Sequence, residues 1–304
     1  MNTITYIDRL SKKQDVEKVY GQAFVEAMYG DGFFSRCVSF LLEPLVCKSP
    51  FLSHLYGFLQ KSSLSRRKIE PFIKEFHVDE SEFLDPTESF TCFNDFFIRR
   101  MKSDVRPIAA DEDVATLPAD ARYLFYPNID KADGFVVKGQ KFDLEELLQD
   151  RMLADRYEKG AMVIARLCPT DYHRFHFPVD CIPSAAKLIN GPLASVNPLA
   201  LKKNINILAQ NKRMITELET EAFGKVLYIE VGATCVGGIC QTYEAHKAYG
   251  KGDEKGYFSF GGSSLILLFE PKVIKFDQDL IEASEKKVEI RGLYGQSMGK
   301  SRLS

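Results

Sequence analysis

The chain has 304 residues, of which 45% are hydrophobic and 27% charged, a balance typical of a folded, water-soluble protein. The formal net charge of -2 comes from 40 basic and 42 acidic residues and argues against a nucleic-acid partner. Seven cysteines without a C-x-x-C pair argue against a disulfide framework and against a cysteine zinc site, so we expect no metal.

The first part of the chain, residues 1–105, is predicted to be helical. Its polar, mixed-charge start lacks the pattern of a signal peptide, so we expect a cytoplasmic protein. Apolar residues between Phe34 and Leu45 recur at helical spacing, and a second apolar face runs from Phe51 to Leu59. No run reaches the roughly 18 apolar residues that span a bilayer. Basic residues follow at once: Lys61, Arg66, Arg67 and Lys68.

Two interpretations of residues 32–68 are open. The apolar faces and basic residues suit a helical element that lies in a membrane surface. They also suit two ordinary helices that pack on a core, and the pattern alone favours this second interpretation.

The pattern predicts a further helix from about Ser81 to Lys102, and then the chain changes character. Short β-rich runs separated by Gly and Pro follow, at 135–137, 161–166, 186–189, 226–231, 257–260 and 265–269. We therefore expect an α+β fold, with a helical part at 1–105 and a mainly antiparallel, β-rich part at 106–304.

The segment YFSFGGSSLILLFEP places two glycines and two serines before an apolar run. Taken alone, Gly261-Gly262-Ser263-Ser264 is ordinary turn chemistry. The alternative is self-processing, in which the Ser263 hydroxyl attacks the unshielded carbonyl of Gly262.

An attacking serine needs a base, and the segment RLCPTDYHRFHFPVD supplies His173 and His176. As a metal site, H-x-x-H is incomplete, since Asp171 alone does not finish a ligand set. Asp120 is one of many loop aspartates that could orient the base. Residue chemistry alone leaves the turn, a core histidine pair and a catalytic group all open.

A resemblance narrows the choice. FNDFFIRRM, PAD, RLCPTDYHRFHFPV, NGPLASVNPLAL, VGATCVGGI and the GGSS…FEP ending occur in the order seen in phosphatidylserine decarboxylases. The similarity covers about residues 80–304. The YHRFH core and the Gly-Ser near the C-terminus are specific only in combination.

The resemblance implies a proenzyme that cleaves itself between Gly262 and Ser263, with Asp120, His176 and Ser263 as the self-cleavage triad. Ser263 would become a covalent pyruvoyl group, the cofactor that forms a Schiff base with the amine of phosphatidylserine. His173 would serve the decarboxylation, which yields phosphatidylethanolamine and CO2.

The resemblance also implies partners. The cleaved β chain 1–262 and α chain 263–304 would stay together as a heterodimer, which leaves open an assembly of several such heterodimers. A lipid substrate makes the membrane-surface interpretation of residues 32–68 the better one. We therefore expect a peripheral protein on the cytoplasmic face of the cell membrane.

The chain departs from the family pattern at two places. The family usually has Leu-Gly-Ser-Thr where this chain has GGSS, and glycine where this chain has Ala121 after Asp120. The fallback aspartates are Asp111, Asp113 and Asp133.

Three rival functions are weighed against the decarboxylase. A serine hydrolase would use the same three residues but lacks the G-x-S-x-G elbow. A non-catalytic membrane-binding protein would use GGSS as a turn. Other pyruvoyl decarboxylases, acting on free amino acids or adenosylmethionine, fit the YHRFHFPV segment less well.

Overall fold

The computed structural model describes residues 4–18, 57–130, 142–233, 238–261 and 263–303. The strands of the main sheet come from the whole length of this part of the chain: β1 (Thr5–Asp8), β2 (Gln14–Val16), β4 (Ala121–Tyr126), β5 (Ala161–Leu167), β7 (Ile182–Pro183), β8 (Lys187–Ile189), β9 (Arg213–Thr220), β10 (Gly224–Gly232), β13 (Ser263–Phe269) and β15 (Glu289–Gly292). Further strands form two smaller sheets: β6 (Arg174–His176), β11 (Ile239–Gln241) and β12 (Glu254–Phe258) in one, and β3 (Val114–Thr116), β14 (Ile274–Phe276) and β16 (Ser297–Ser301) in the other.

The helices are short. They are α4 (Ile69–Phe76), α5 (Phe93–Phe97), α6 (Leu144–Leu148), α7 (Arg151–Tyr157), α8 (Pro198–Lys203), α9 (Ile207–Gln210) and α10 (Gln278–Glu285). Single 3-10 turns lie at η1 (Ser63–Lys68), η2 (Glu80–Glu82) and η3 (Thr87–Ser89). Aspartate caps explain two of the starts, since Asp143 and Asp150 accept the backbone N–H groups of Glu146 in α6 and Leu153 in α7.

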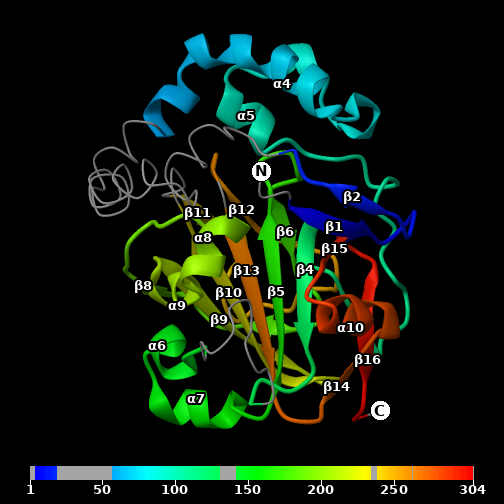
Figure 1. Ribbon diagram of the computed structural model, residues 1–304, viewed down its shortest axis with the longest axis vertical. Helices are drawn as coiled ribbons and strands as arrows, with labels where there is room; N and C mark the ends of the chain where they lie inside the picture. Colours follow the sequence, from blue (N-terminus) through cyan, green and yellow to red (C-terminus); the bar gives the residue numbers. More distant parts are fainter. Residues whose placement is uncertain (1–3, 19–56, 131–141, 234–237, 262, 304) are drawn as a thin grey trace.

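The main sheet has the order β2-β1-β15-β4-β5-β13-β10-β9-β7, with β8 beside β9 (Figure 1). Its pairings are antiparallel apart from β1 with β15. The predicted α+β fold with a mainly antiparallel sheet is therefore confirmed. Strand β13 lies between β5 and β10, which places Ser263 at one end of a central strand.

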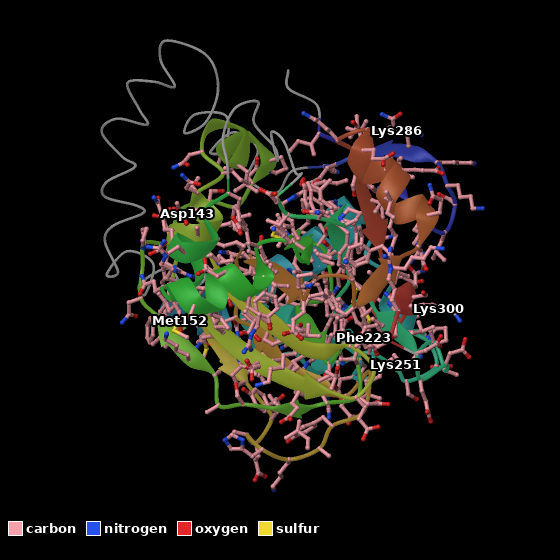
Figure 2. All side chains as sticks on the ribbon, turned by 90° about the horizontal axis from the view of Figure 1, so that it is seen from below. Asp143, Met152, Phe223, Lys251, Lys286 and Lys300 are labelled. Carbon is pink, nitrogen blue, oxygen red and sulfur yellow. The ribbon has the colours of Figure 1, made fainter. Side chains whose placement is uncertain are left out.

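The sheet is buried on both faces, as the continuous apolar run of β13 requires. One face of β13 carries Leu265 and Leu267, which pack with Phe175 of β6 and Phe258 of β12. The opposite face carries Ile266, which packs in a second core with the helices α6 to α9. Figure 2 shows side chains crowded between these layers, while Lys286 and Met152 lie at the periphery.

Helices α4 and α5 lie over the top of the sheet in Figure 1. They are held by a third core, here called the phenylalanine cap, whose members are Ile69, Phe72, Ile73, Phe83, Phe90, Phe93, Phe96, Phe97 and Phe260. Phe260 is the only member outside the N-terminal part among the described residues, and it lies three positions before Ser263. The cap therefore ties the N-terminal elements to the segment that contains the serines.

The predicted helix from Ser81 to Lys102 is wrong. This stretch holds η2, η3 and α5, separated by extended residues such as Pro86 at ψ 149°. The chain doubles back so that Phe83 bridges Met101 and the Leu84 N–H donates to the Arg100 carbonyl. The phenylalanines share one cluster because the chain folds back, not because they line one helix face.

The other predicted elements have mixed outcomes. The predicted runs at 161–166, 186–189, 226–231 and 265–269 coincide with β5, β8, β10 and β13, and the run at 257–260 is offset from β12. The run at 135–137 and the apolar stripes of residues 34–56 lie outside the described residues. Residues 5–16 form β1 and β2 of the main sheet, so the described N-terminal part is not wholly helical. The boundary at residue 105 stays a prediction.

Candidate active site

Ser263 opens β13 opposite Leu167 of β5 and Gly232 of β10. Its side chain is fully buried, and its Oγ has no hydrogen-bond partner among the described residues. A buried hydroxyl without a partner loses the hydrogen bonds that it makes with water, so its position calls for an explanation. Gly262 lies outside the described residues. Gly261 before it has φ 137°, which favours glycine at this position.

The two serines differ in the face of the sheet that they occupy. Successive strand residues alternate, so Ser263 shares the face of Leu265 and Ser264 that of Ile266. Leu265 packs in the core that includes Phe175 of β6, the strand that ends at His176. Ser263 thus lies on the side of the histidine segment, whereas Ser264 lies on the other side, opposite Arg166 in the register.

His173 lies beyond the end of β5, close to the register partner of Ser263. Its Nε2 is 2.9 Å from the carbonyl oxygen of Cys168, the residue after Leu167. The carbonyl can only accept, so Nε2 donates and Nδ1 keeps a lone pair, for which no partner is present in the described residues. The ring stacks on Phe97 at 3.8 Å between centroids. Burial lowers the pKa of His173 to about 3, so the imidazole is neutral at pH 7.

His176 has the complementary arrangement. Its Nδ1 donates to the Gly252 carbonyl oxygen at 2.9 Å, which leaves the lone pair on Nε2. Nε2 is buried and has no partner in the described residues. Burial lowers the pKa of His176 below its ordinary value of 6.5, against the opposing effects of the Gly252 hydrogen bond, Glu254 and Asp120. The imidazole is therefore a neutral proton acceptor at pH 7.

Asp120 and His176 both contact Tyr294. The Tyr294 N–H donates to Asp120 at 2.9 Å, and the Tyr294 ring stacks on the His176 ring at 4.1 Å. Arg106 binds the Asp120 carboxylate through Nε and Nη2 at 2.8–3.2 Å, and both side chains are buried. In the described residues no hydrogen bond joins Asp120 to His176, or either histidine to Ser263.

The structure shows where Ala121 and two of the fallback aspartates lie. Ala121 begins β4 as a strand residue paired with Gly292, so this position does not call for glycine. Asp111 and Asp113 lie near Lys300 at the surface, at 3.5 and 3.6 Å. Asp133 lies outside the described residues.

Sequence reasoning missed a buried charge network behind the site. Arg122 and Arg166 are neighbours on β4 and β5, and both contact the carboxylate of Glu17. Arg122 also binds Asp171 at 2.7 Å, and Asp171 accepts the Cys168 N–H. The network therefore fixes the turn that leads from β5 to His173. An arginine inside an apolar β-rich run, as in Ala161–Leu167, was the available signal.

The described elements bring the predicted residues into one buried region at the end of β5 and β13. Two neutral histidines there each present an unpartnered ring nitrogen, and Ser263 presents an unpartnered hydroxyl. Such a set can accept a proton from a hydroxyl. The described residues contain no group of three or more His, Cys, Asp or Glu side chains that could hold a metal ion.

Comparison with known proteins decides the family. The profile of the phosphatidylserine decarboxylase family matches residues 93–300. The chain belongs to the phosphatidylserine decarboxylase family. It is 48% identical to a protein of Chlamydia caviae over 99% of each chain, and 46% identical to one of Chlamydia pneumoniae over 97% of each. A protein of Fusobacterium nucleatum is 43% identical over 97% of each chain.

All three relatives are called phosphatidylserine decarboxylase proenzymes. The family profile begins at Phe93 in α5, so it takes in the end of the phenylalanine cap and continues into the β16 strand. Both histidines, Asp120 and Ser263 lie within the matched range.

Proposed function

We propose that this chain is a proenzyme that cleaves itself between Gly262 and Ser263 and then decarboxylates phosphatidylserine to phosphatidylethanolamine. The family supports the substrate. The observation that carries the self-cleavage is the set of buried, unpartnered polar atoms at the two diagnostic motifs. They are Ser263 Oγ, Ser264 Oγ, His173 Nδ1 and His176 Nε2.

In the cleavage, His176 accepts the Ser263 proton through its Nε2 lone pair. The Ser263 oxygen attacks the Gly262 carbonyl, and the amide becomes an ester as the Ser263 nitrogen is released. Loss of the Ser263 α-proton then expels the Gly262 carboxylate and leaves a dehydroalanine. One water hydrolyses its imine form, releases ammonia and leaves the pyruvoyl group at the start of the α chain.

Asp120 assists through its charge rather than through a direct hydrogen bond. The carboxylate accepts the Tyr294 N–H and raises the pKa of His176 against the effect of burial. It therefore stabilises the imidazolium that forms when His176 takes the proton. Arg106 holds Asp120 in place.

Ser263 suits the pyruvoyl group because its position is buried and its oxygen has no partner to displace among the described residues. The pyruvoyl supplies an electron sink for the pair of electrons that CO2 leaves behind. The neutral His173 donates through Nε2 to the carbonyl of Cys168, the residue after the register partner of Ser263, so its Nδ1 lone pair can take up a proton and then pass it on in this step. Since the product amine carbon must be protonated, a proton donor at this place is required.

Intact mass and a denaturing gel test the proposal. The wild-type chain should yield the fragments 1–262 and 263–304, the smaller with a ketone in place of its amino terminus. Ser263→Ala and His176→Ala should stay uncut, while Ser264→Ala should be cut. An uncut wild-type chain with a free hydroxyl would favour a serine hydrolase or a non-catalytic protein instead. Cleavage of Ser263→Ala would exclude the assigned nucleophile.

We also propose that the N-terminal part docks the enzyme on the cytoplasmic face of the cell membrane. Phe58, Leu59 and Leu64 are 72%, 52% and 73% exposed. They lie beside basic residues that are exposed as well: Lys61, Arg66, Arg67 and Lys68. Apolar side chains flanked by cations suit the surface of an anionic bilayer. No described helix is long and apolar enough to cross a membrane.

Substitution tests this docking better than deletion of residues 1–70, which would also remove β1 and Glu17 from the fold. Phe58→Ser with Leu64→Ser should reduce binding to phosphatidylserine-containing vesicles at unchanged stability. Met152→Ser is the matched control, since Met152 is 85% exposed on α7, at the opposite end of the molecule (Figure 1). Equal binding by the double variant and the control would reject the role of these residues.

A further inference from the structure

Arg99 carries a buried charge that has no acidic partner in the described residues. Its side chain lies just after α5 between the rings of Phe83 and Phe96, with the guanidinium carbon 5.1 and 4.9 Å from their centroids. Only 3% of the residue is exposed. Its hydrogen bonds are long, 3.4 Å to the Phe96 carbonyl and 3.5 Å to the Thr170 carbonyl, and Nε has none among these residues.

The other buried cations of the described residues either contact a carboxylate or make several short hydrogen bonds to backbone carbonyls. Arg106, Arg122, Arg166 and Lys255 each contact at least one carboxylate. Arg213 instead donates to three backbone carbonyls at 2.6–2.8 Å. Burial lowers the pKa of Arg99 to about 10, which leaves it charged at pH 7. An uncompensated buried charge destabilises a fold, and a bound anion would offset that cost.

Arg99 lies next to the proposed decarboxylation residue. Phe97, two residues earlier, stacks on His173, and Thr170, three residues before His173, accepts from Arg99. The Arg174 Nε donates to the Ile98 carbonyl at 2.9 Å, which closes the same region from the other side. Burial, together with the charge of Arg99, lowers the pKa of His173.

The phenylalanine cap, on which Arg99 packs, also anchors the proposed docking surface. Ser65, one residue after the exposed Leu64, accepts the Phe93 N–H at 2.9 Å through its hydroxyl, so this surface is fastened to α5. The phenylalanine cap thus joins a surface suited to acyl chains to the region of the buried histidine, and Arg99 packs on two of its rings. In a phospholipid the phosphodiester likewise lies between the acyl chains and the serine.

We propose that Arg99 binds the phosphodiester of the lipid headgroup, an inference that rests on the proposed function. A phosphodiester is a strong acceptor for a guanidinium, which can present two N–H groups to it. The serine carboxylate is the poorer match because CO2 leaves as a neutral molecule. A cation on that carboxylate would stabilise the substrate more than the transition state and would slow the reaction.

The test measures steady-state kinetics of purified, processed Arg99→Gln with short-chain phosphatidylserine in detergent. Self-cleavage should be complete, KM should rise roughly 10- to 100-fold and kcat should change little. Short-chain phosphatidylethanolamine, which retains the phosphodiester but not the carboxylate, should lose potency as a product inhibitor by a similar factor. A raised KM with unchanged product inhibition would overturn the proposal in favour of a carboxylate contact.

Two further variants separate binding from folding. Arg99→Met should melt no lower than the wild type, because it replaces an uncompensated buried charge with an apolar side chain, yet it should show the raised KM. Arg99→Lys should recover part of the affinity. Arg100→Gln is the matched control, since the exposed Arg100 pairs with Asp85 at the surface, and its KM should not change.

The outcomes distinguish this proposal from the proposed function. An uncut, inactive wild-type chain would reject the function and this inference with it. An active wild type beside Arg99 variants with unchanged KM would reject the inference alone, as would a large fall in the melting temperature of Arg99→Met.

Discussion

Burial sets the protonation state of both histidines, and each is held in one tautomer by a backbone carbonyl. The same burial that keeps the rings neutral leaves one nitrogen of each without a partner in the described residues. Neutral rings with fixed lone pairs are what proton transfer from Ser263 requires.

The pH dependence of self-cleavage follows from His176. Burial lowers its pKa below 6.5, so the ring loses its lone pair to a proton only at lower pH. We expect the cleavage rate of freshly refolded proenzyme to stay near its maximum at pH 6.5 and to halve at a lower pH. A gel time course from pH 4.5 to 8 measures this, and a midpoint above 6.5 would contradict the assignment.

His173 is proposed to serve the decarboxylation and not the self-cleavage. His173→Ala should be cut at the wild-type rate and then release no CO2 from phosphatidylserine, because its Nδ1 serves only the second step. Gel and CO2 measurements on one preparation suffice. An uncut His173→Ala chain whose melting temperature equals that of the wild type would show that the division of labour is wrong.

The sequence indicated the individual motif residues but not the side chains and backbone groups that they contact. Ser263, His173 and His176 belong to two short segments that are specific in combination. The partners of Asp120 are Arg106 and Tyr294, and Tyr294 lies 174 positions after it in the chain. Arg99 stands out only because no acidic side chain contacts it in the described residues. Such relations arise from long-range packing, which a single sequence does not display.

Among the elements, the phenylalanine cap connects the N-terminal part to both site segments. Phe96 lies at its centre, fully buried and in ring contact with Phe72, Phe83, Phe90 and Phe93. The cap reaches the site through Phe97 on His173 and through Phe260 before the serines. Its packing therefore supports the geometry of the site.

Phe96→Ala should lower the free energy of unfolding by about 3–5 kcal/mol, because it opens a cavity in this cluster. Phe58→Ala should change it by less than about 0.5 kcal/mol, since Phe58 is 72% exposed. Urea unfolding of uncut chains, both carrying Ser263→Ala, compares the two without interference from cleavage. Equal losses would show that the cap does not carry this stability.

The strands that were predicted well have apolar residues in continuous runs or in strong alternation with polar ones. Strands β5, β10 and β13 are central and buried, so most of their residues must be apolar, and this shows in the sequence. The helix predicted at 81–102 failed because its phenylalanine spacing fits a helix face, while Pro86 and the return of the chain at Arg100 impose turns.

Over the whole molecule, Glu17 clamps the N-terminal segment to the middle of the sheet. Burial disfavours its charge, but the ion pairs and hydrogen bonds from Arg166 and Arg122 outweigh burial and lower its pKa to about 2. The folded pKa lies below the ordinary value of 4.5, so ionised Glu17 stabilises the fold above that pH. This stabilisation is lost as the pH falls from 4.5 towards 2.

Glu17→Gln should cost about 1–3 kcal/mol at pH 7, because it removes the carboxylate that Arg122 and Arg166 share, although Arg122 keeps Asp171 and Arg166 keeps Glu289. The difference from wild type should shrink as the pH falls below 4.5. Thermal unfolding at pH 7, 5 and 3 measures it, with the exposed Glu75→Gln as control. A constant difference across this range would contradict the role of Glu17.

A cut before Ser263 would leave β13 and β15 in the small chain, and each lies between two strands of the large one. Neither chain could then leave without dismantling the main sheet. Once unfolded, however, the halves would diffuse apart, and refolding would depend on protein concentration where that of the uncut chain does not. The chain would have to fold before it is cleaved. A mature enzyme that unfolds would then be replaced by newly made protein, because its separated chains would refold poorly.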